Sequence, residues 1–148
     1  MKRRTVRELE EACRDRGLRG TRQRRAILEV LARRRDHPTA DQVYEKTRAA
    51  LPDLSRTTVY RVLDTLVAAG VARNVCHPGA AVRYEARNAR HDHLVCVRCN
   101  RLMDVVSPSL DDIRLPSTRK LGFKVEDYTV QIRGVCSECR RKAKKTRR

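Results

Sequence analysis

The sequence predicts an α+β fold in two parts: short helices that end in a hairpin, followed by a small module of strands. Apolar residues recur at helical spacing up to about residue 70, alternating residues flank a turn signal near residue 78, and two Cys-x-x-Cys pairs enclose the second half. We expect residues 1–83 to form a first domain, 84–91 a hinge, 92–139 a second domain, and 140–148 a basic, disordered tail.

Four helices are predicted in the first domain. A short amphipathic helix occupies residues 6–17, and Thr21 can cap a second, arginine-rich helix. Thr39 and Gln42 have the spacing of a capping box, in which each side chain satisfies a backbone N–H at the start of a third helix. Ser55 can cap a fourth helix, which a glycine ends.

Two strands, residues 71–75 and 81–86, are expected to form a hairpin across His77, Pro78 and Gly79. Short helices followed by a hairpin are the pattern of a winged helix-turn-helix domain, whose last helix enters the major groove of DNA. There the fourth helix would present Tyr60 and Arg61 to base edges, and Thr57 or Thr58 to phosphates. The alternatives are a half-buried packing role for Tyr60 and a plain surface charge for Arg61.

The second domain is predicted to be a small α/β module. Strands at residues 94–97 and 102–106 flank a cysteine knuckle, and residues 110–121 have helical spacing that Pro116 should interrupt. Residues 123–132 alternate as a strand, with a bulge expected near Glu126 and Asp127.

The net charge is the strongest global signal. A formal charge of +17 and a pI near 10.6 favour a polyanionic partner such as DNA, RNA or anionic lipid. Lys and Arg outnumber Asp and Glu by 19 to 10 in residues 1–83, 9 to 8 in residues 84–139, and 7 to 0 in residues 140–148. Because no apolar run is long enough for a secretory signal or a membrane span, we expect a cytoplasmic protein without a membrane partner.

Four cysteines have the spacing of a metal site. Two tight pairs, separated by 36 residues, supply the thiolates for a closed, structural Zn²⁺ site: Cys96, Cys99, Cys136 and Cys139. The competing interpretation is a pair of redox-active dithiols, which would hold no stoichiometric metal.

A second group of side chains has no thiolate. It comprises His37, Glu85, His91, His93 and Asp104. Imidazole and carboxylate donors suit Fe²⁺, Mn²⁺ or Zn²⁺, and a His-x-His pair on one strand points both rings to the same side. Asp92 should point to the opposite face and take part in neither site.

From Gly17 to about Cys139 the chain resembles the Fur (ferric uptake regulator) family of metal-dependent bacterial repressors. The resemblance rests on LRGTRQRRAIL, HPTADQVY, LSRTTVYRVLDTL, RYEA before HDHLVCVRC, and GVCSEC. It implies a homodimer that binds palindromic operator DNA, a winged-helix domain and a dimerisation domain, with no small organic ligand. It further implies that the four cysteines bind structural zinc and that the second group binds a regulatory Fe²⁺ or Mn²⁺ at the hinge. Tyr60 and Arg61 match base-contacting positions, and Arg19 matches a residue that reaches the minor groove.

Two residues of the second group resemble different branches of the family. Asp104 resembles the peroxide-sensing branch, in which metal-catalysed oxidation of the histidines at the positions of His37 and His91 releases DNA. Glu85 resembles the iron-uptake branch, whereas zinc-uptake regulators usually have cysteine at that position. We expect a peroxide-responsive repressor, with an iron-responsive repressor of metal-uptake genes as the alternative. Tyr128 stands where some members have a second-site histidine, beside an acid at the position of Asp111, so that second site is not expected.

Other classes of protein explain less of the sequence. A dithiol oxidoreductase usually has its Cys-x-x-Cys at the start of a helix in a βαβ unit, whereas the pairs here follow predicted strands. A metal-dependent hydrolase needs an open coordination position, and five protein ligands leave little room for a substrate. A general RNA-binding or chromatin-packaging protein would explain the charge but not the ligands. We therefore do not expect an enzyme.

Overall fold

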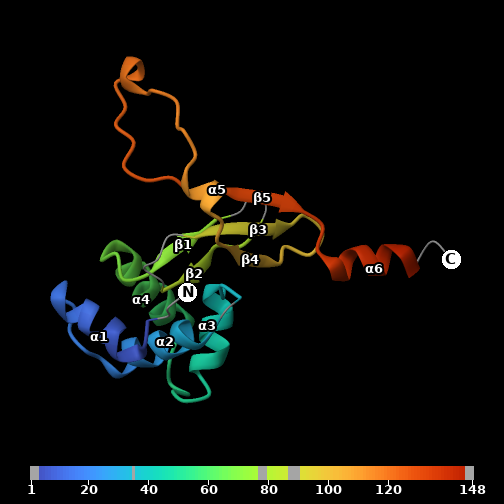
Figure 1. Cartoon of the computed structure of the whole chain (residues 1–148). Helices are drawn as coiled ribbons and strands as arrows, with labels where there is room; N and C mark the ends of the chain where they lie inside the picture. Colours follow the sequence, from blue (N-terminus) through green and yellow to red (C-terminus); the bar gives the residue numbers. More distant parts are fainter. Residues whose placement is uncertain (1–3, 35, 77–79, 87–90, 146–148) are drawn as a thin grey trace. The chain divides into compact units, whose positions relative to one another are not determined.

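The computed structural model describes residues 4–34, 36–76, 80–86 and 91–145 (Figure 1). The chain forms two compact units, Met1–Ala89 and Arg90–Arg148. The first is mainly helical and the second contains a mixed sheet, which confirms the predicted α+β class. That residues 84–91 act as a hinge remains a prediction.

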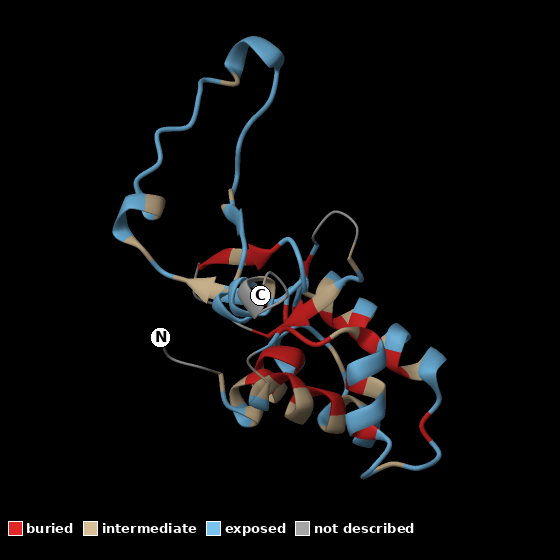
Figure 2. Cartoon of the chain, turned by 90° about the vertical axis from the view of Figure 1, so that its right-hand side faces the viewer, coloured by how far each residue is buried: buried red, intermediate tan, exposed pale blue. Residues whose placement is uncertain are grey.

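The first unit contains four helices that pack around one aliphatic core. They are α1 (Val6–Asp15), α2 (Arg22–Arg33), α3 (Ala40–Thr47) and α4 (Arg56–Ala68). Each helix contributes one apolar stripe, and Figure 2 shows these stripes as the buried faces of otherwise exposed helices. The largest core side chains include Leu9, Ile27, Leu28, Val43, Val59, Leu63 and Leu66. A core without Trp or Phe is possible because branched aliphatic residues recur at helical spacing on every helix.

The predicted helix starts are confirmed. Thr39 accepts from the backbone N–H of Gln42 at 3.3 Å, and the Gln42 side chain accepts from the N–H of Thr39 at 3.0 Å. The side chains of Thr21 and Ser55 cap α2 and α4 in the same manner with one bond each. Helix α4 ends at Ala68, and Gly70 follows two residues later with a φ of 67°, in the left-handed region that residues with a Cβ avoid.

A two-stranded antiparallel sheet completes the first unit. It pairs β1 (Arg73–Val75) with β2 (Arg83–Glu85), and Asn74 lies opposite Tyr84. The predicted hairpin strands are therefore present, although shorter, and the predicted turn at residues 77–79 lies outside the described residues. Strand β2 also contacts the start of α3, through a bridge between Thr39 and Arg83 and a bond from the Tyr84 N–H to the Pro38 carbonyl at 2.9 Å.

The second unit is built on a three-stranded sheet in the order β4-β3-β5. Strand β3 (Asp92–Cys96) is antiparallel to β4 (Leu102–Val105) and parallel to β5 (Gln131–Gly134). The two predicted strands around the first cysteine pair are confirmed within two residues at each end.

The predicted strand at residues 123–132 is wrong over most of its length. Strand β5 begins only at Gln131, so the bulge expected near Glu126 and Asp127 does not form. Residues 107–130 instead make a long excursion from the sheet that contains no buried residue (Figures 1 and 2). Alternation alone does not make a strand, because a strand also needs a neighbouring edge to bond with.

Helix formation in this excursion is limited to one short helix at its start and one turn near its middle. Helix α5 covers Pro108–Asp111 and a 3₁₀ turn, η1, covers Arg119–Leu121. Pro116 lies in the non-helical stretch between them, as expected from its missing N–H donor.

The prediction of a disordered tail is wrong for residues 140–145, which continue helix α6 (Ser137–Lys145). Arg and Lys have good helix propensity. The start of α6 is also fixed by Cys136, just before the helix, and by Cys139 in its first turn, which both belong to the cysteine cluster. Composition alone did not reveal this anchor. Residues 146–148 lie outside the described part. Among the described residues, the helices are too short or too polar to cross a lipid bilayer.

Candidate metal sites and DNA interface

The four cysteines predicted to bind zinc converge in the second unit. Their sulfur atoms all lie within 4.8 Å of one another, and the sulfurs of Cys99 and Cys136 are 3.8 Å apart. A tetrahedral Zn²⁺ with bonds of about 2.3 Å to sulfur places its ligands about 3.8 Å apart. The cluster therefore has the size and donor set of a four-thiolate zinc site.

Local backbone structure brings each cysteine pair to this point. Cys96 ends β3 and Cys99 lies in the turn that follows, where Asn100 has a φ of 55° and its N–H donates to the Cys96 carbonyl at 2.9 Å. Asn tolerates the left-handed region better than most residues, which suits it to this tight turn. Cys136 directly precedes α6 and Cys139 lies in its first turn. Each pair thus comes from a single tight turn.

The thiols strongly influence one another. The pKa of Cys96 is lowered to about 6, chiefly because the backbone N–H of Cys136 donates to its sulfur at 3.4 Å. The pKa of Cys139 is raised to about 12, chiefly by its hydrogen bonds with the Cys136 and then the Cys99 thiols. Four negative charges cannot gather here unaided, whereas a dication stabilises all four thiolates together.

Three ligands of the second group lie together in the second unit. Asp104 is the cross-strand partner of His93 in the β3–β4 ladder, and His91 precedes β3 by one residue. The Nε2 atoms of His91 and His93 lie 3.8 Å and 4.0 Å from Asp104 Oδ1. Ligands bound to one divalent ion at about 2.1 Å lie roughly 3 to 4 Å apart, so these three donors are spaced for a shared metal.

The other two ligands lie together in the first unit. His37 Nε2 is 3.0 Å from Glu85 Oε2, and both side chains are buried. His37 lies between α2 and α3, and Glu85 ends β2, so 48 positions of sequence separate the two partners. The fold of the first unit, rather than local sequence, makes this pair.

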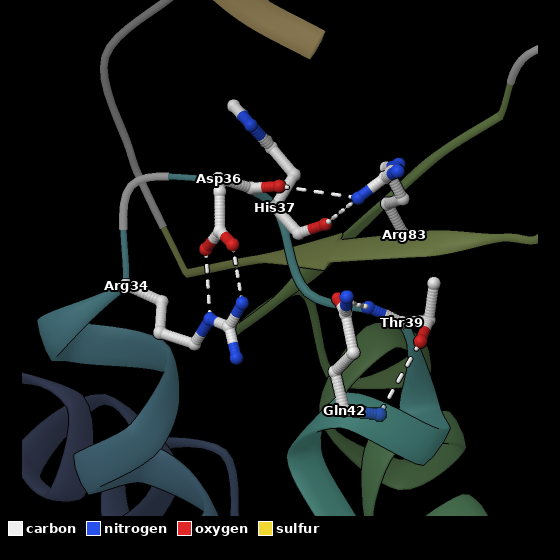
Figure 3. A network of polar contacts seen from close by, with 6 residues as sticks. All are labelled: Arg34, Asp36, His37, Thr39, Gln42 and Arg83. Atoms are coloured by element: carbon white, nitrogen blue, oxygen red, sulfur yellow. Dashed lines mark hydrogen bonds and ion pairs between the residues drawn. The ribbon is translucent and has the colours of Figure 1, made fainter. Parts of the chain in front are cut away.

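The turn that carries His37 has a strained backbone, which is stabilised by contacts from Arg34, Arg83 and the cap of α3 (Figure 3). His37 has a φ of 49°, a left-handed conformation that costs a non-glycine residue on the order of 1 kcal/mol or more. Arg83 Nη1 donates to the Asp36 and His37 carbonyls at 3.2 Å and 2.9 Å. The Arg34 guanidinium binds the Asp36 carboxylate with two hydrogen bonds and thereby lowers the pKa of Asp36. The capping box of α3 fixes the chain just beyond.

The residues proposed for DNA contact lie on the surface of the first unit. Thr57, Tyr60 and Arg61 are exposed on α4, and Arg19 is exposed in the loop between α1 and α2. Tyr60 is 43% exposed and lies outside the buried core cluster of the first unit. Thr58 differs, because its hydroxyl lies 2.9 Å from the Ser55 hydroxyl within the helix cap.

Sequence reasoning missed a polar cluster that joins α3 to α4. Arg56, the first residue of α4, contacts the carboxylates of Asp41 and Glu45 and lies over the Tyr44 ring, with its guanidinium carbon 4.6 Å from the centroid. This cluster ties the proposed recognition helix to the helix before it. No local signal in the sequence reveals this cluster, because Glu45 and Asp41 lie 11 and 15 residues before Arg56.

Two further side chains have structural rather than metal-binding positions. Asp92 is buried, and its carboxylate accepts from the Val130 N–H at 2.8 Å, just before β5. The Tyr128 hydroxyl donates to the Leu110 and Asp111 carbonyls at 3.1 Å and 2.9 Å. Asp92 thus joins the strands as a structural residue, and Tyr128 joins the end of the excursion to α5 at its start.

Comparison with known proteins agrees with this arrangement. Residues 15–133 match the ferric uptake regulator family. The peroxide operon regulator of Bacillus subtilis (strain 168) is 34% identical over 137 residues, which cover 93% of this chain and 94% of that protein. The Helicobacter pylori ferric uptake regulator has a similar structure, with a TM-score of 0.79 at 24% identity over 95% of this chain and 97% of that one. An iron-containing ferric uptake regulator of Francisella tularensis gives a TM-score of 0.71 at 29% identity over 84% and 96%. This chain belongs to the ferric uptake regulator family and is a metal-dependent transcriptional regulator, not an enzyme.

Proposed function

We propose that this protein is a peroxide-responsive repressor that binds operator DNA as a homodimer when a regulatory Fe²⁺ or Mn²⁺ is bound. The observation that carries the proposal is the division of the second ligand group. Two donors, His37 and Glu85, belong to the unit with the helix-turn-helix, and three, His91, His93 and Asp104, belong to the unit with the sheet. Neither set alone completes the five or six ligands that these ions prefer.

One ion that takes ligands from both sets would fix the orientation of the two units. A metal shifts such an equilibrium only by its difference in affinity for the two states, and moving a ratio of 1:99 to 99:1 takes about 5.5 kcal/mol. In a dimer this would set two α4 helices at the separation of the two halves of a palindromic operator. The residues proposed to meet DNA are Arg19, Thr57, Thr58, Tyr60 and Arg61.

The four-cysteine cluster supports a different role for zinc. Four thiolates leave no open coordination position, and Zn²⁺ is redox-inert, so a zinc ion there would stabilise the second unit without responding to peroxide. Reduced thiols are needed for this site, which agrees with action in the cytoplasm, where the operator DNA also lies.

Exposed apolar residues of the second unit support the homodimer. Leu121 and Phe123 are 81% and 66% exposed, and Val106 is 59% exposed. Soluble monomers rarely leave such groups of large apolar side chains in water. We expect Phe123→Ser to convert the dimer to a monomer in sedimentation equilibrium, whereas the neighbouring Lys124→Ser should not.

Peroxide sensing requires that the regulatory metal be redox-active. Bound iron would supply that activity. One oxygen atom of hydrogen peroxide is added to an imidazole ring, and the other is released in a water molecule. The side chains of His37 and His91 are the expected acceptors, and each oxidised ring would lose its value as a ligand. Support comes from the 34% identity with a peroxide operon regulator and from an aspartate at position 104.

Glu85 favours a second candidate, an iron-responsive repressor of metal-uptake genes. The decisive experiment measures operator binding by fluorescence anisotropy with Fe²⁺, Mn²⁺, Zn²⁺ or a chelator at one salt concentration, before and after dilute peroxide. Peroxide sensing predicts that peroxide abolishes binding only with iron and adds 16 Da to a peptide containing His37 or His91. Release by chelation alone, with no oxidised peptide, would favour iron sensing. Equal binding with and without metal would overturn both candidates.

A further inference from the structure

Helix α6 and the residues after it hold the most concentrated charge in the chain. Residues 140–148 contain seven Lys and Arg and no acidic residue, whereas residues 84–139 contain nine against eight. The second unit is therefore almost neutral except at this helix. The match to the family model covers residues 15–133, and this charge lies after it.

The cysteine cluster anchors the start of α6. The helix begins directly after Cys136, and Cys139 lies in its first turn with its sulfur in the cluster. Glu138 adds an ion pair to Arg101, whose Nη1 lies 3.3 Å from Glu138 Oε2. The first turn is thus fixed to the turn after β3, and the rest of the helix projects away from the sheet (Figure 1).

Helix stability does not explain where the charges lie. Cations near a helix C-terminus interact favourably with the helix dipole, but Arg140 and Arg141 lie before the last turn of α6, where that gain is small. Arg140, Arg141 and Lys142 place three neighbouring positive charges on the exposed part of α6, and a polyanion would offset their mutual repulsion.

The shape of α6 favours DNA over a membrane. Its apolar residues are Cys139 and Ala143, both half-buried, while Arg140, Arg141 and Lys142 are exposed. A helix that lies on a lipid surface needs a broad apolar face, which these two small residues do not supply. Nine helical residues span about 13 Å, and along that length a DNA duplex carries about eight phosphate charges.

We propose that α6 is a second DNA contact, which binds the phosphates of duplex DNA without reading its sequence. The inference rests on the proposed DNA-binding function and adds to it a backbone contact outside the helix-turn-helix. Phosphate contacts of this kind release counterions, so their number sets how steeply affinity falls with salt.

The test compares two triple variants with the same net charge. One is Arg140→Gln/Arg141→Gln/Lys142→Gln in α6, and the matched control is Arg114→Gln/Arg119→Gln/Lys120→Gln in the excursion of the same unit. Affinity for an operator duplex and for a random duplex of equal length is measured from 50 to 200 mM KCl. Zinc content and dimer mass are checked for each variant.

If α6 makes two phosphate contacts per chain, its loss lowers the slope of log K against log[salt] by about 3.6 for the dimer, and the affinity lost between 50 and 200 mM becomes roughly 150-fold smaller. The decrease should be equal for both duplexes and absent from the control. Equal slopes in the two variants, or an α6 variant that behaves like the parent, would overturn the inference.

Two further arms separate other outcomes. Vesicles of phosphatidylglycerol and phosphatidylcholine, and a single-stranded RNA, are tested with the parent and both variants. Loss of vesicle or RNA binding in the α6 variant, with DNA binding unchanged, would contradict a DNA contact. A parent whose operator binding ignores Fe²⁺ and Mn²⁺ would contradict the proposed function, while the random-duplex slopes would still decide the role of α6.

Discussion

The two ligand groups differ in how their residues are distributed. All four cysteines belong to the second unit and come from two tight turns, so the donors of that cluster are close together whatever the first unit does. The second group is divided, with His37 and Glu85 in one unit and His91, His93 and Asp104 in the other. A metal bound within one unit can only stabilise that unit, whereas a metal that takes ligands from two units can report on their arrangement. The two donor sets also differ in chemistry, because four thiolates suit a closed zinc site, whereas imidazoles with carboxylates suit Fe²⁺ or Mn²⁺.

The largest expected effect comes from breaking the cysteine cluster. Cys96→Ser should unfold the second unit, because structural zinc sites contribute on the order of 10 kcal/mol to folding. Circular dichroism during heating and zinc analysis would show a lost transition and less than one zinc per chain. Cys76→Ser, which changes a cysteine outside the cluster, should leave both unchanged. A Cys96 variant with normal stability would remove the distinction between the two ligand groups.

The next largest effect should come from the divided group. His37→Ala removes a ligand, and since outer-shell changes alone cost 10-fold to 100-fold in metal affinity, a ligand should cost at least about 100-fold. Mn²⁺ titration should show this loss while zinc content and the thermal transition stay normal. His77→Ala is the matched control, because His77 belongs to neither group. Loss of zinc in His37→Ala would show that the two groups are not independent.

A smaller effect is expected behind His37, where Arg83 holds the turn (Figure 3). Arg83→Ala removes the donor that bonds the Asp36 and His37 carbonyls, so the left-handed turn can relax. Mn²⁺ affinity should then fall by about tenfold, within the range for residues that orient ligands. Arg83→Lys, which retains one donor group, should recover part of the loss. Equal metal affinity in parent and alanine variant would mean that the turn is positioned without Arg83.

The smallest effect is expected at Arg56. Its ion pairs with Asp41 and Glu45 are about half-exposed, so Arg56→Ala should reduce the free energy of unfolding by no more than about 1 kcal/mol. A double-mutant cycle with Glu45→Gln in urea would isolate the pair. A coupling of several kcal/mol would show that the α3–α4 contact is far more rigid than an exposed ion pair.

Much of the fold followed from local sequence. The capping box of Thr39 and Gln42 and the caps at Thr21 and Ser55 marked helix starts, because capping depends on residues only three apart. The strand at 123–132 failed because strand formation depends on a partner edge, and the alternation of Phe123 and Val125 carries no information about one. Helix α6 was missed because its charge suggested disorder, while the cysteine cluster that anchors it forms only in the folded unit.

The candidate metal ligands were predictable for a related reason. Cysteine pairs and a His-x-His pair have local spacing that restricts their chemistry, while His37, Glu85 and Asp104 were grouped with the His pair by donor type and matched to a site by the family resemblance. The supporting contacts were not predictable, because Arg83 and Arg56 bind partners distant in sequence. The left-handed φ of His37 likewise has no sequence signal such as a glycine.

The most direct test of the central claim follows the imidazole signals of the four histidines while Mn²⁺ is added to the zinc-loaded protein. Paramagnetic Mn²⁺ broadens the NMR signals of rings that it contacts. The account predicts that His37, in the first unit, broadens together with His91 and His93, in the second, and that all three changes are complete at one Mn²⁺ per chain. Separate titration of His37 from His91 and His93, or broadening of one set alone, would contradict a single ion shared by the two units.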